Sequence, residues 1–122
     1  MSKGQTNLGR NAVIEAFVNG RDITISQLVV GSGDTPFAES DTDLQTELAS
    51  YDTDNSVRGT GRARFDATIP ENDASVDDET LREAGLVTSD GDLVSRIVFA
   101  DTPKQSGSRL EVEYTKRQRN PE

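Results

Sequence analysis

The first residues with a spacing that could support chemistry are two glycines near the end of the first third of the chain. Gly31-Ser32-Gly33 has the beginning of a phosphate-binding loop. Pro36 stands where the third glycine of that motif would be, however, and no Lys follows it. The segment is therefore more simply explained as a tight turn after a strand.

The stretch from Asp52 to Ser56 resembles the start of a calcium-binding loop, with Asp52 and Asp54 at positions where ligands would be. The sixth position is Val57 instead of Gly, and the twelfth is Ala63 instead of Glu. The pattern favours a solvated acidic loop. Asp52 and Asp54 stay as weak candidates for a cation, and we expect neither a metal site nor a cofactor.

Histidine and cysteine are absent from all 122 residues. Without them the chain has no thiol nucleophile, no Ser-His-Asp triad and no zinc site of the ordinary type. Carboxylates are frequent enough to supply a pair for glycoside hydrolysis, but no two of them stand out. Aromatic residues that would hold a sugar make up only 5% of the chain. We therefore expect a protein that is not an enzyme.

The charge balance points away from nucleic acid, because 13 Lys and Arg face 22 Asp and Glu and give a net charge of -9. No apolar run approaches the ~20 residues of a membrane span, and the first residues lack the apolar core of a signal peptide. Asp outnumbers Glu and Arg outnumbers Lys. This balance is typical of proteins from extreme halophiles, in which salt screens self-repulsion. An ordinary acidic surface that keeps the protein soluble is the alternative.

Hydrophobic periodicity predicts the helices. Apolar residues on one helical face predict a helix over 8–18, begun by Thr6 or Asn7 and ended by Asn19-Gly20. A capping-box pattern at Thr42 and Gln45 predicts a short second helix over 43–49.

Alternating apolar and polar residues predict the strands, and Asp90-Gly91 predicts a hairpin turn between two of them. The predicted strands cover 21–30, with a bulge near 26–27, and then 62–69, 81–87, 93–100 and 110–115. Polar loops are expected over 52–60 and 101–108. The sum is a single mainly β (α+β) domain, a small antiparallel β-sandwich or sheet covered on one side by the first helix. Its compact part is 7–115, and a basic tail follows over 116–122.

Two groups of basic residues stand out against the acidic background. Arg62 and Arg64 share one face of a predicted strand, where they can grip an acidic partner or neutralise the domain's own carboxylates. Lys116, Arg117 and Arg119 belong to the basic tail, which is either free or docked into a neighbouring acidic subunit.

Two segments of the chain resemble the tail-fibre and tail-collar attachment domains of tailed viruses. Those domains begin with a short helix, then a strand that ends in a Gly-x-Gly turn, as at Gly31 to Gly33, and a segment similar to Asp43-Leu-Gln-Thr-Glu-Leu48. Their second signature, Arg-Glu-x-Gly-Leu-Phe, is similar to Arg82-Glu-Ala-Gly-Leu-Val87, with Val87 in place of Phe. The similarity runs from about residue 7 to residue 114.

The resemblance implies structural roles for single residues. Gly31, Gly33 and Gly85 would hold special backbone geometry. Glu83 would be held by a specific partner, and Arg96 across the hairpin is the candidate. The core would be filled by Ile69, Leu81, Leu86, Phe99, Val112 and Tyr114.

In that family the domain mounts a longer fibre on the tail or baseplate, and here the chain stops where the fibre shaft would begin. The resemblance therefore implies a stand-alone virion part, made in the host cytoplasm. It would be an oligomeric tail, baseplate or collar adaptor that docks onto other virion proteins. The halophile-like composition would make the host a haloarchaeon. The alternatives are a capsid decoration or turret protein, and a non-viral β-sandwich that binds a small ligand or glycan.

The expected partners are copies of the chain itself, as a trimer or ring, and other virion proteins, with no nucleic acid and no membrane. Exposed edge strands are the natural place for subunits to pair. We therefore expect Leu110 to Tyr114, including Val112, or Arg62 to Ile69 to lie beside another chain.

Overall fold

A computed structural model describes residues 2–20, 24–57 and 62–117. In these ranges one helix and eight strands follow one another. They are β1 (Ser2–Gln5), α1 (Asn7–Asn19), β2 (Ile25–Gly31), β3 (Glu47–Asp52), β4 (Asp54–Val57), β5 (Arg62–Ile69), β6 (Glu79–Thr88), β7 (Leu93–Lys104) and β8 (Leu110–Arg117).

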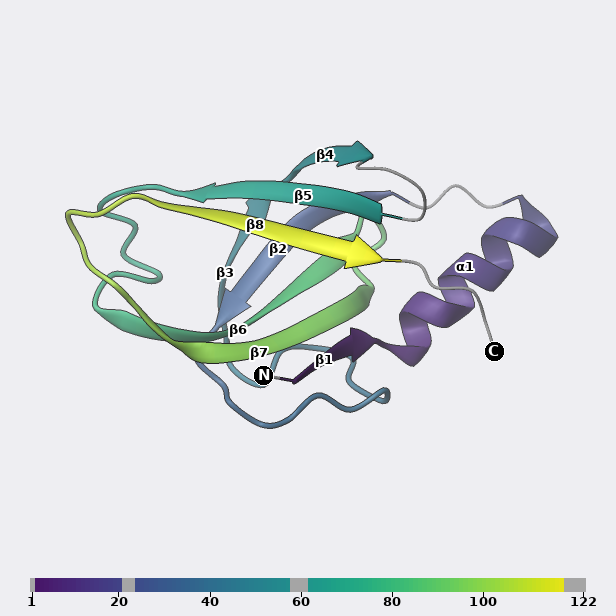
Figure 1. The fold of residues 1–122 in the computed structure, drawn as a ribbon, viewed down its shortest axis with the longest axis horizontal. Coiled ribbons are helices and arrows are strands. Elements are labelled where there is room, and N and C mark those ends of the chain that lie inside the picture. Colours follow the sequence, from purple (N-terminus) through teal and green to yellow (C-terminus); the bar gives the residue numbers. More distant parts are fainter. Residues whose placement is uncertain (1, 21–23, 58–61, 118–122) are drawn as a thin grey trace.

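Two antiparallel sheets pack face to face and confirm the predicted mainly β fold (Figure 1). The larger sheet has five strands in the order β1-β7-β6-β2-β3. The smaller sheet has three strands in the order β4-β5-β8. The chain passes from the larger to the smaller sheet directly after β3, where Asp52 and Asp54 flank the crossing at Thr53.

The main core lies between the two sheets. Alternate residues of each strand point to the same face, so every second side chain of a strand is directed toward the other sheet. Leu28 and Val30 of β2 belong to one buried cluster with Phe65 and Ile69 of β5 and with Tyr114 of β8. Of the predicted core residues, four are buried and two are partly buried. The buried ones are Ile69, Leu81, Leu86 and Tyr114, and the partly buried ones are Phe99 and Val112.

The opposite face of the larger sheet is covered by the connection between β2 and β3, residues 32–46, which we call the covering loop. Val29 points away from the main core and packs instead with Leu44 of this loop and Leu93 of β7. The predicted bulge near 26–27 is confirmed, since the register of β2 on β6 shifts between Ile25 and Gln27.

The predicted first helix forms, but it does not cover a sheet. The Thr6 hydroxyl caps it by accepting the Gly9 N–H at 3.0 Å, and Gly20 ends it with a φ of 67°. Only Gly9 and Ala12 are buried, and α1 leaves the sandwich at one end (Figure 1). The prediction of a covering helix is wrong because the covering loop already occupies that sheet face.

The predicted second helix over 43–49 is wrong, because residues 47–49 belong to β3 and pair with β2. The apparent capping box makes other bonds. The Gln45 side chain accepts the Thr35 N–H at 2.8 Å, and the backbone N–H groups of Gln45 and Thr46 donate to Glu83. Contacts from distant parts of the chain therefore override the local helical pattern.

Several strand limits also differ from the prediction. β7 continues to Lys104, so residues 101–104 are not loop, and β4 lies within the predicted loop over 52–60. β1 is too short and too polar to show a periodic signal. Lys116 and Arg117 belong to β8 instead of a tail, whereas Arg119 lies outside the described residues.

The packing predicts a contrast between two large apolar side chains. Leu28→Ala removes a fully buried side chain and should lower the free energy of unfolding by about 2–5 kcal/mol. Phe17→Ala alters a side chain that is 82% exposed and should change it by less than about 0.5 kcal/mol. Urea denaturation checks both. An equal loss for both variants would contradict the position of α1.

Candidate functional site

The densest polar constellation surrounds Glu83 of β6, whose side chain is fully buried. Its Oε2 accepts the backbone N–H groups of Gly33 and Thr46, each at 2.8 Å. Its Oε1 accepts the Gln45 N–H at 2.8 Å and the Nε–H of Arg96 at 3.1 Å. We call these five residues the Glu83 clamp. The predicted pairing of Glu83 with Arg96 is confirmed.

Arg96 of β7 extends the clamp toward the middle of the covering loop. Its side chain is 2% exposed, and its Nη1 donates to Asp41 Oδ2 at 3.2 Å. The same Asp41 oxygen accepts the Ala38 N–H at 3.0 Å. Arg96 Nη2 lies 3.0 Å from Glu83 Oε1 as an ion-pair contact without hydrogen-bond geometry. The pair therefore fastens the covering loop at its beginning, middle and end.

The three glycines predicted to hold special backbone geometry are needed for space instead. None of them has a positive φ. A Cβ at Gly31 would collide with the carbonyl oxygen of Thr46, and one at Gly33 would lie 2.5 Å from Glu83 Oε2. At Gly85 a Cβ would lie 2.5 Å from Leu93 Cδ1. Gly33 belongs to the clamp and Gly31 borders it, so a side chain at either position would push the loop off the sheet.

The clamp is suited to holding structure and not to acting on a substrate. Both oxygens of the Glu83 carboxylate are saturated by donors from the protein, and the group is sealed from solvent. A buried carboxylate without such partners would cost several kcal/mol, so the four donors are what make its burial possible.

A second polar cluster, which the sequence did not indicate, ties down the connection between β5 and β6. Lys104, 2% exposed, donates to Asp77 Oδ1 and to the Gln105 carbonyl, each at 2.9 Å. The Tyr51 hydroxyl donates to Asp73 Oδ2 at 2.6 Å. This hydrogen bond is the main cause of the lowered pKa of Asp73, and burial raises the pKa of Tyr51. Lys104 was missed because it falls in a stretch predicted as loop.

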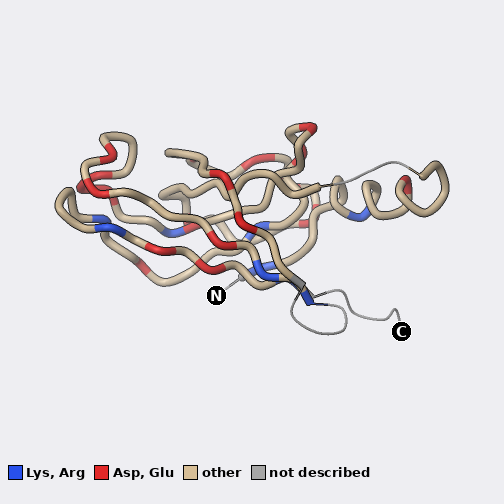
Figure 2. Tube along the Cα trace, turned by 90° about the horizontal axis from the view of Figure 1, so that it is seen from above, with Lys and Arg blue, Asp and Glu red and all other residues tan. Residues whose placement is uncertain are grey.

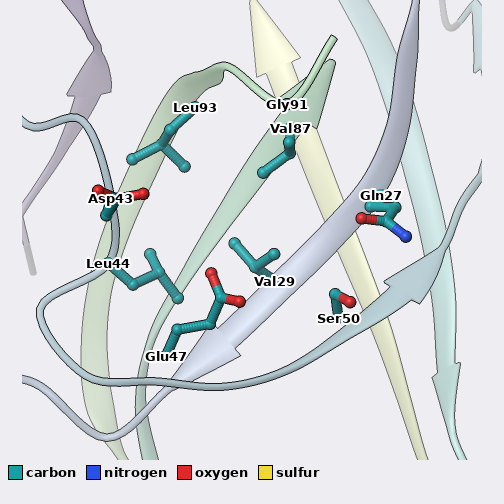
Figure 3. A pocket seen from close by; sticks show the side chains of 9 residues that line it. All are labelled: Gln27, Val29, Asp43, Leu44, Glu47, Ser50, Val87, Gly91 and Leu93. Carbon is teal, nitrogen blue, oxygen red and sulfur yellow. The ribbon is translucent and has the colours of Figure 1, made fainter. Parts of the chain in front are cut away.

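A shallow pocket opens between the covering loop and the β6–β7 hairpin (Figure 3). Its volume is about 220 Å³, below the ~300 Å³ at which most ligand sites begin. Its lining combines apolar side chains with the carboxylates of Asp43 and Glu47, and the Glu47 side chain points between Leu44 and Val29. The lining is completed by Gln27, Val29, Leu44, Ser50, Val87, Gly91 and Leu93.

The weak cation candidates do not form a loop. Asp52 ends β3 and Asp54 begins β4, and Asn55 uses its side-chain amide to donate to the Ile25 carbonyl at 2.7 Å. Within residues 2–20, 24–57 and 62–117, no group of three or more acidic side chains is placed to hold a metal ion.

The two arginines predicted on β5 lie in different environments. Arg62 is exposed, whereas Arg64 Nε donates to Asp66 Oδ1 at 2.8 Å and its Nη2 lies 3.4 Å from Glu113 Oε2. For Arg64 this arrangement supports the role of neutralising the domain's own carboxylates. The side chains of both Asp66 and Glu113 remain partly exposed, so these pairs contribute little stability.

Of the residues on other strands that were predicted to lie in an interface, some are buried in the core. Leu86 and Tyr114 are buried, and Tyr114 shares a 2.7 Å hydrogen bond with Ser95 of the opposite sheet. Burial raises the pKa of Tyr114 to about 12. Leu110 and Val112 are partly buried on β8, whose only strand partner in the described residues is β5.

A further surface, which sequence reasoning missed, is an apolar face on α1. Ile14, Phe17 and Val18 are 58%, 82% and 73% exposed, and their spacing puts them on one side of the helix. We call these three residues the α1 apolar face. The sequence contained one sign of this exposed face, because Ile14 and Val18 lie outside the apolar stripe that predicts the helix.

Within the described ranges, no helix is long and apolar enough to cross a membrane.

The clamp predicts a large stability loss in Glu83→Gln. The amide nitrogen cannot accept a hydrogen bond, so buried donors lose their partner, and Arg96 loses one of its two carboxylate partners. The free energy of unfolding should fall by about 3–5 kcal/mol in urea titrations. Glu39→Gln is the matched control, since its 2.7 Å pair with Arg10 is on the surface and its loss should barely alter stability.

The second cluster predicts a shift in one carboxyl pKa. Asp73 has a lowered pKa in the folded state, so it stabilises the fold above the pKa of the unfolded chain, and this contribution disappears as the pH falls through the folded value. Tyr51→Phe removes the main cause, and the pKa of Asp73 should rise toward its ordinary value in a carboxyl ¹³C NMR titration. Tyr114→Phe should leave it unchanged, and a shift there would contradict the assignment.

No known protein family, no curated protein and no solved structure matches the chain.

Proposed function

We propose that this chain is a virion structural protein, an oligomeric adaptor of the tail, baseplate or collar that docks onto other virion proteins and mounts or anchors fibres. The α1 apolar face carries this proposal. Three large apolar side chains stand in solvent on a helix that projects from the sandwich (Figure 1). Such a clustered apolar surface usually marks a site that another macromolecule covers.

The energetics of this surface favour a docking role. Burial of a fully exposed Phe or Ile contributes about 1.5–3 kcal/mol to association. The position of α1 makes the face easy to reach, because both buried residues of the helix, Gly9 and Ala12, lie in its first half. A partner can therefore pack on the far half without any change in the sandwich.

The interior supports a mounting role. The buried charges of the domain serve contacts within it, since Glu83 and Arg96 hold the covering loop and Lys104 holds Asp77. These contacts make a rigid block on which outer surfaces keep fixed positions. Rigid positioning is what an adaptor between larger parts requires.

The assignment to a tail or collar is supported by the resemblance to tail-fibre and tail-collar attachment domains. The excess of Asp over Glu and of Arg over Lys supports a halophilic host. A capsid decoration or turret protein would use the same kind of surface. Its position in the particle would distinguish it.

A non-viral ligand- or glycan-binding module is the second candidate, and the pocket of Figure 3 is the observation that favours it. Its small volume and open form make it a weaker basis than the α1 apolar face. Titration with a panel of glycans, followed by amide chemical shifts of Val87 and Gly91, would reveal such binding.

The proposal predicts that Ile14→Ser/Phe17→Ser weakens incorporation into virus particles. Loss of two apolar contacts should lower affinity for the virion partner by about tenfold or more. The amount of the chain in purified particles, measured by quantitative mass spectrometry, should fall accordingly. Stability in urea should change little, because both side chains are mostly exposed.

Asn19→Ser is the control on the same helix, since Asn19 is exposed but polar. It should be incorporated like the unchanged chain. Absence of the unchanged chain from purified particles would overturn the proposed function. Equal incorporation of the double variant would show that the α1 apolar face is not the docking surface.

A further inference from the structure

We infer that β8 pairs antiparallel with β8 of a second copy across a two-fold axis, joining the two smaller sheets into one. This inference rests on the proposed function, because it names the contact through which copies of the adaptor assemble. It uses a different surface from the α1 apolar face, which stays available for other virion proteins.

β8 presents the longest edge among the described strands. The four edge strands are β1, β3, β4 and β8. β8 has eight residues, whereas the others have four, six and four. Its pairing with β5 is continuous from Leu110 to Arg117, while the β2–β3 pairing is interrupted by a register shift. A long, regular edge without a bulge is the kind that accepts another strand.

Charge distinguishes β8 from the other edges more sharply. An isologous pair brings the same strand together with itself, so the strand must be complementary to itself. β3 and β4 carry only acidic charges, and β1 carries only a basic one. β8 is acidic in its first half, at Glu111 and Glu113, and basic at its end, at Lys116 and Arg117. Figure 2 shows Lys and Arg where the described part of the chain stops.

The charges also select a register. With Tyr114 on the axis, Glu111 of each copy lies opposite Arg117 of the other, and pairing extends over Glu111 to Arg117. Glu113 then lies opposite Thr115. Opposite charges placed directly across two strands favour pairing.

Shifting the axis toward the start of β8 removes this match. With Glu113 on the axis, the two copies of Glu113 face each other. With Val112 on the axis, Glu111 faces Glu113 twice. Like charges directly opposite one another are unfavourable. Shifting the axis to Thr115 keeps one match, between Glu113 and Arg117, but shortens the paired stretch of β8.

Charge reversal tests this register in the full-length chain. Glu111→Arg should raise the dimer dissociation constant about tenfold at low salt, and Arg117→Glu should do the same. Each substitution gives positions 111 and 117 the same charge, and the two-fold axis brings these positions opposite each other twice. The double variant Glu111→Arg/Arg117→Glu restores opposite charges and should recover dimerisation. Sedimentation velocity over a concentration series measures all three. Failure of the double variant to recover would overturn the register.

Amide hydrogen exchange provides a readout that salt does not screen. The outward-facing amides of β8 should gain protection as the protein concentration rises, whereas those of β3 should not. A dimer in which β8 gains no protection, and which Phe17→Ser abolishes, would overturn the β8 inference and leave the proposed docking function standing. A monomer at every concentration and salt would also overturn it. The particle analysis above would still decide the proposed function separately.

Discussion

The structure depends on one buried carboxylate. Glu83 comes from the middle of β6, yet three of its four donors lie in the covering loop, 37 to 50 residues away in sequence. The fourth donor, Arg96, is held in turn by Asp41. Without this set of bonds, the covering loop would lose its polar attachment to Glu83 and Arg96 at the sheet. The small apolar cluster beneath it, around Val29 and Leu44, would then be open to water.

This arrangement gives the buried charged groups a structural role and leaves function to the surface of the domain. Its most buried charged groups are satisfied internally, so they fix shape and are not presented to a ligand. In the part of the chain that the structure describes, the surfaces proposed for function are the α1 apolar face, the open edge of β8 and a shallow pocket. All three are surface features, which fits a protein that acts by being held between other molecules, as proposed above.

The sequence predicted those parts of the fold that depend on neighbouring residues. The strand over Arg62 to Ile69 was predicted in full, because its alternating side chains meet one core face and one solvent face. The helix over 43–49 was wrong because Glu83, far along the chain, takes the amides of Gln45 and Thr46. The exposure of the second half of α1 could not be predicted either, since only the folded chain shows that a loop covers the sheet. The Glu83–Arg96 pair came from a family resemblance and not from periodicity.

The loop end of the Glu83 clamp is made by main-chain groups. Any amino acid except proline can donate a backbone N–H from position 46, which faces solvent, whereas Gln45 also uses its side chain to accept the Thr35 N–H. The attachment through position 46 is therefore independent of side-chain identity. Sequence drift at this position can reshape the neighbouring surface while the backbone stays in place, so the same scaffold can acquire new binding preferences without first losing its fold.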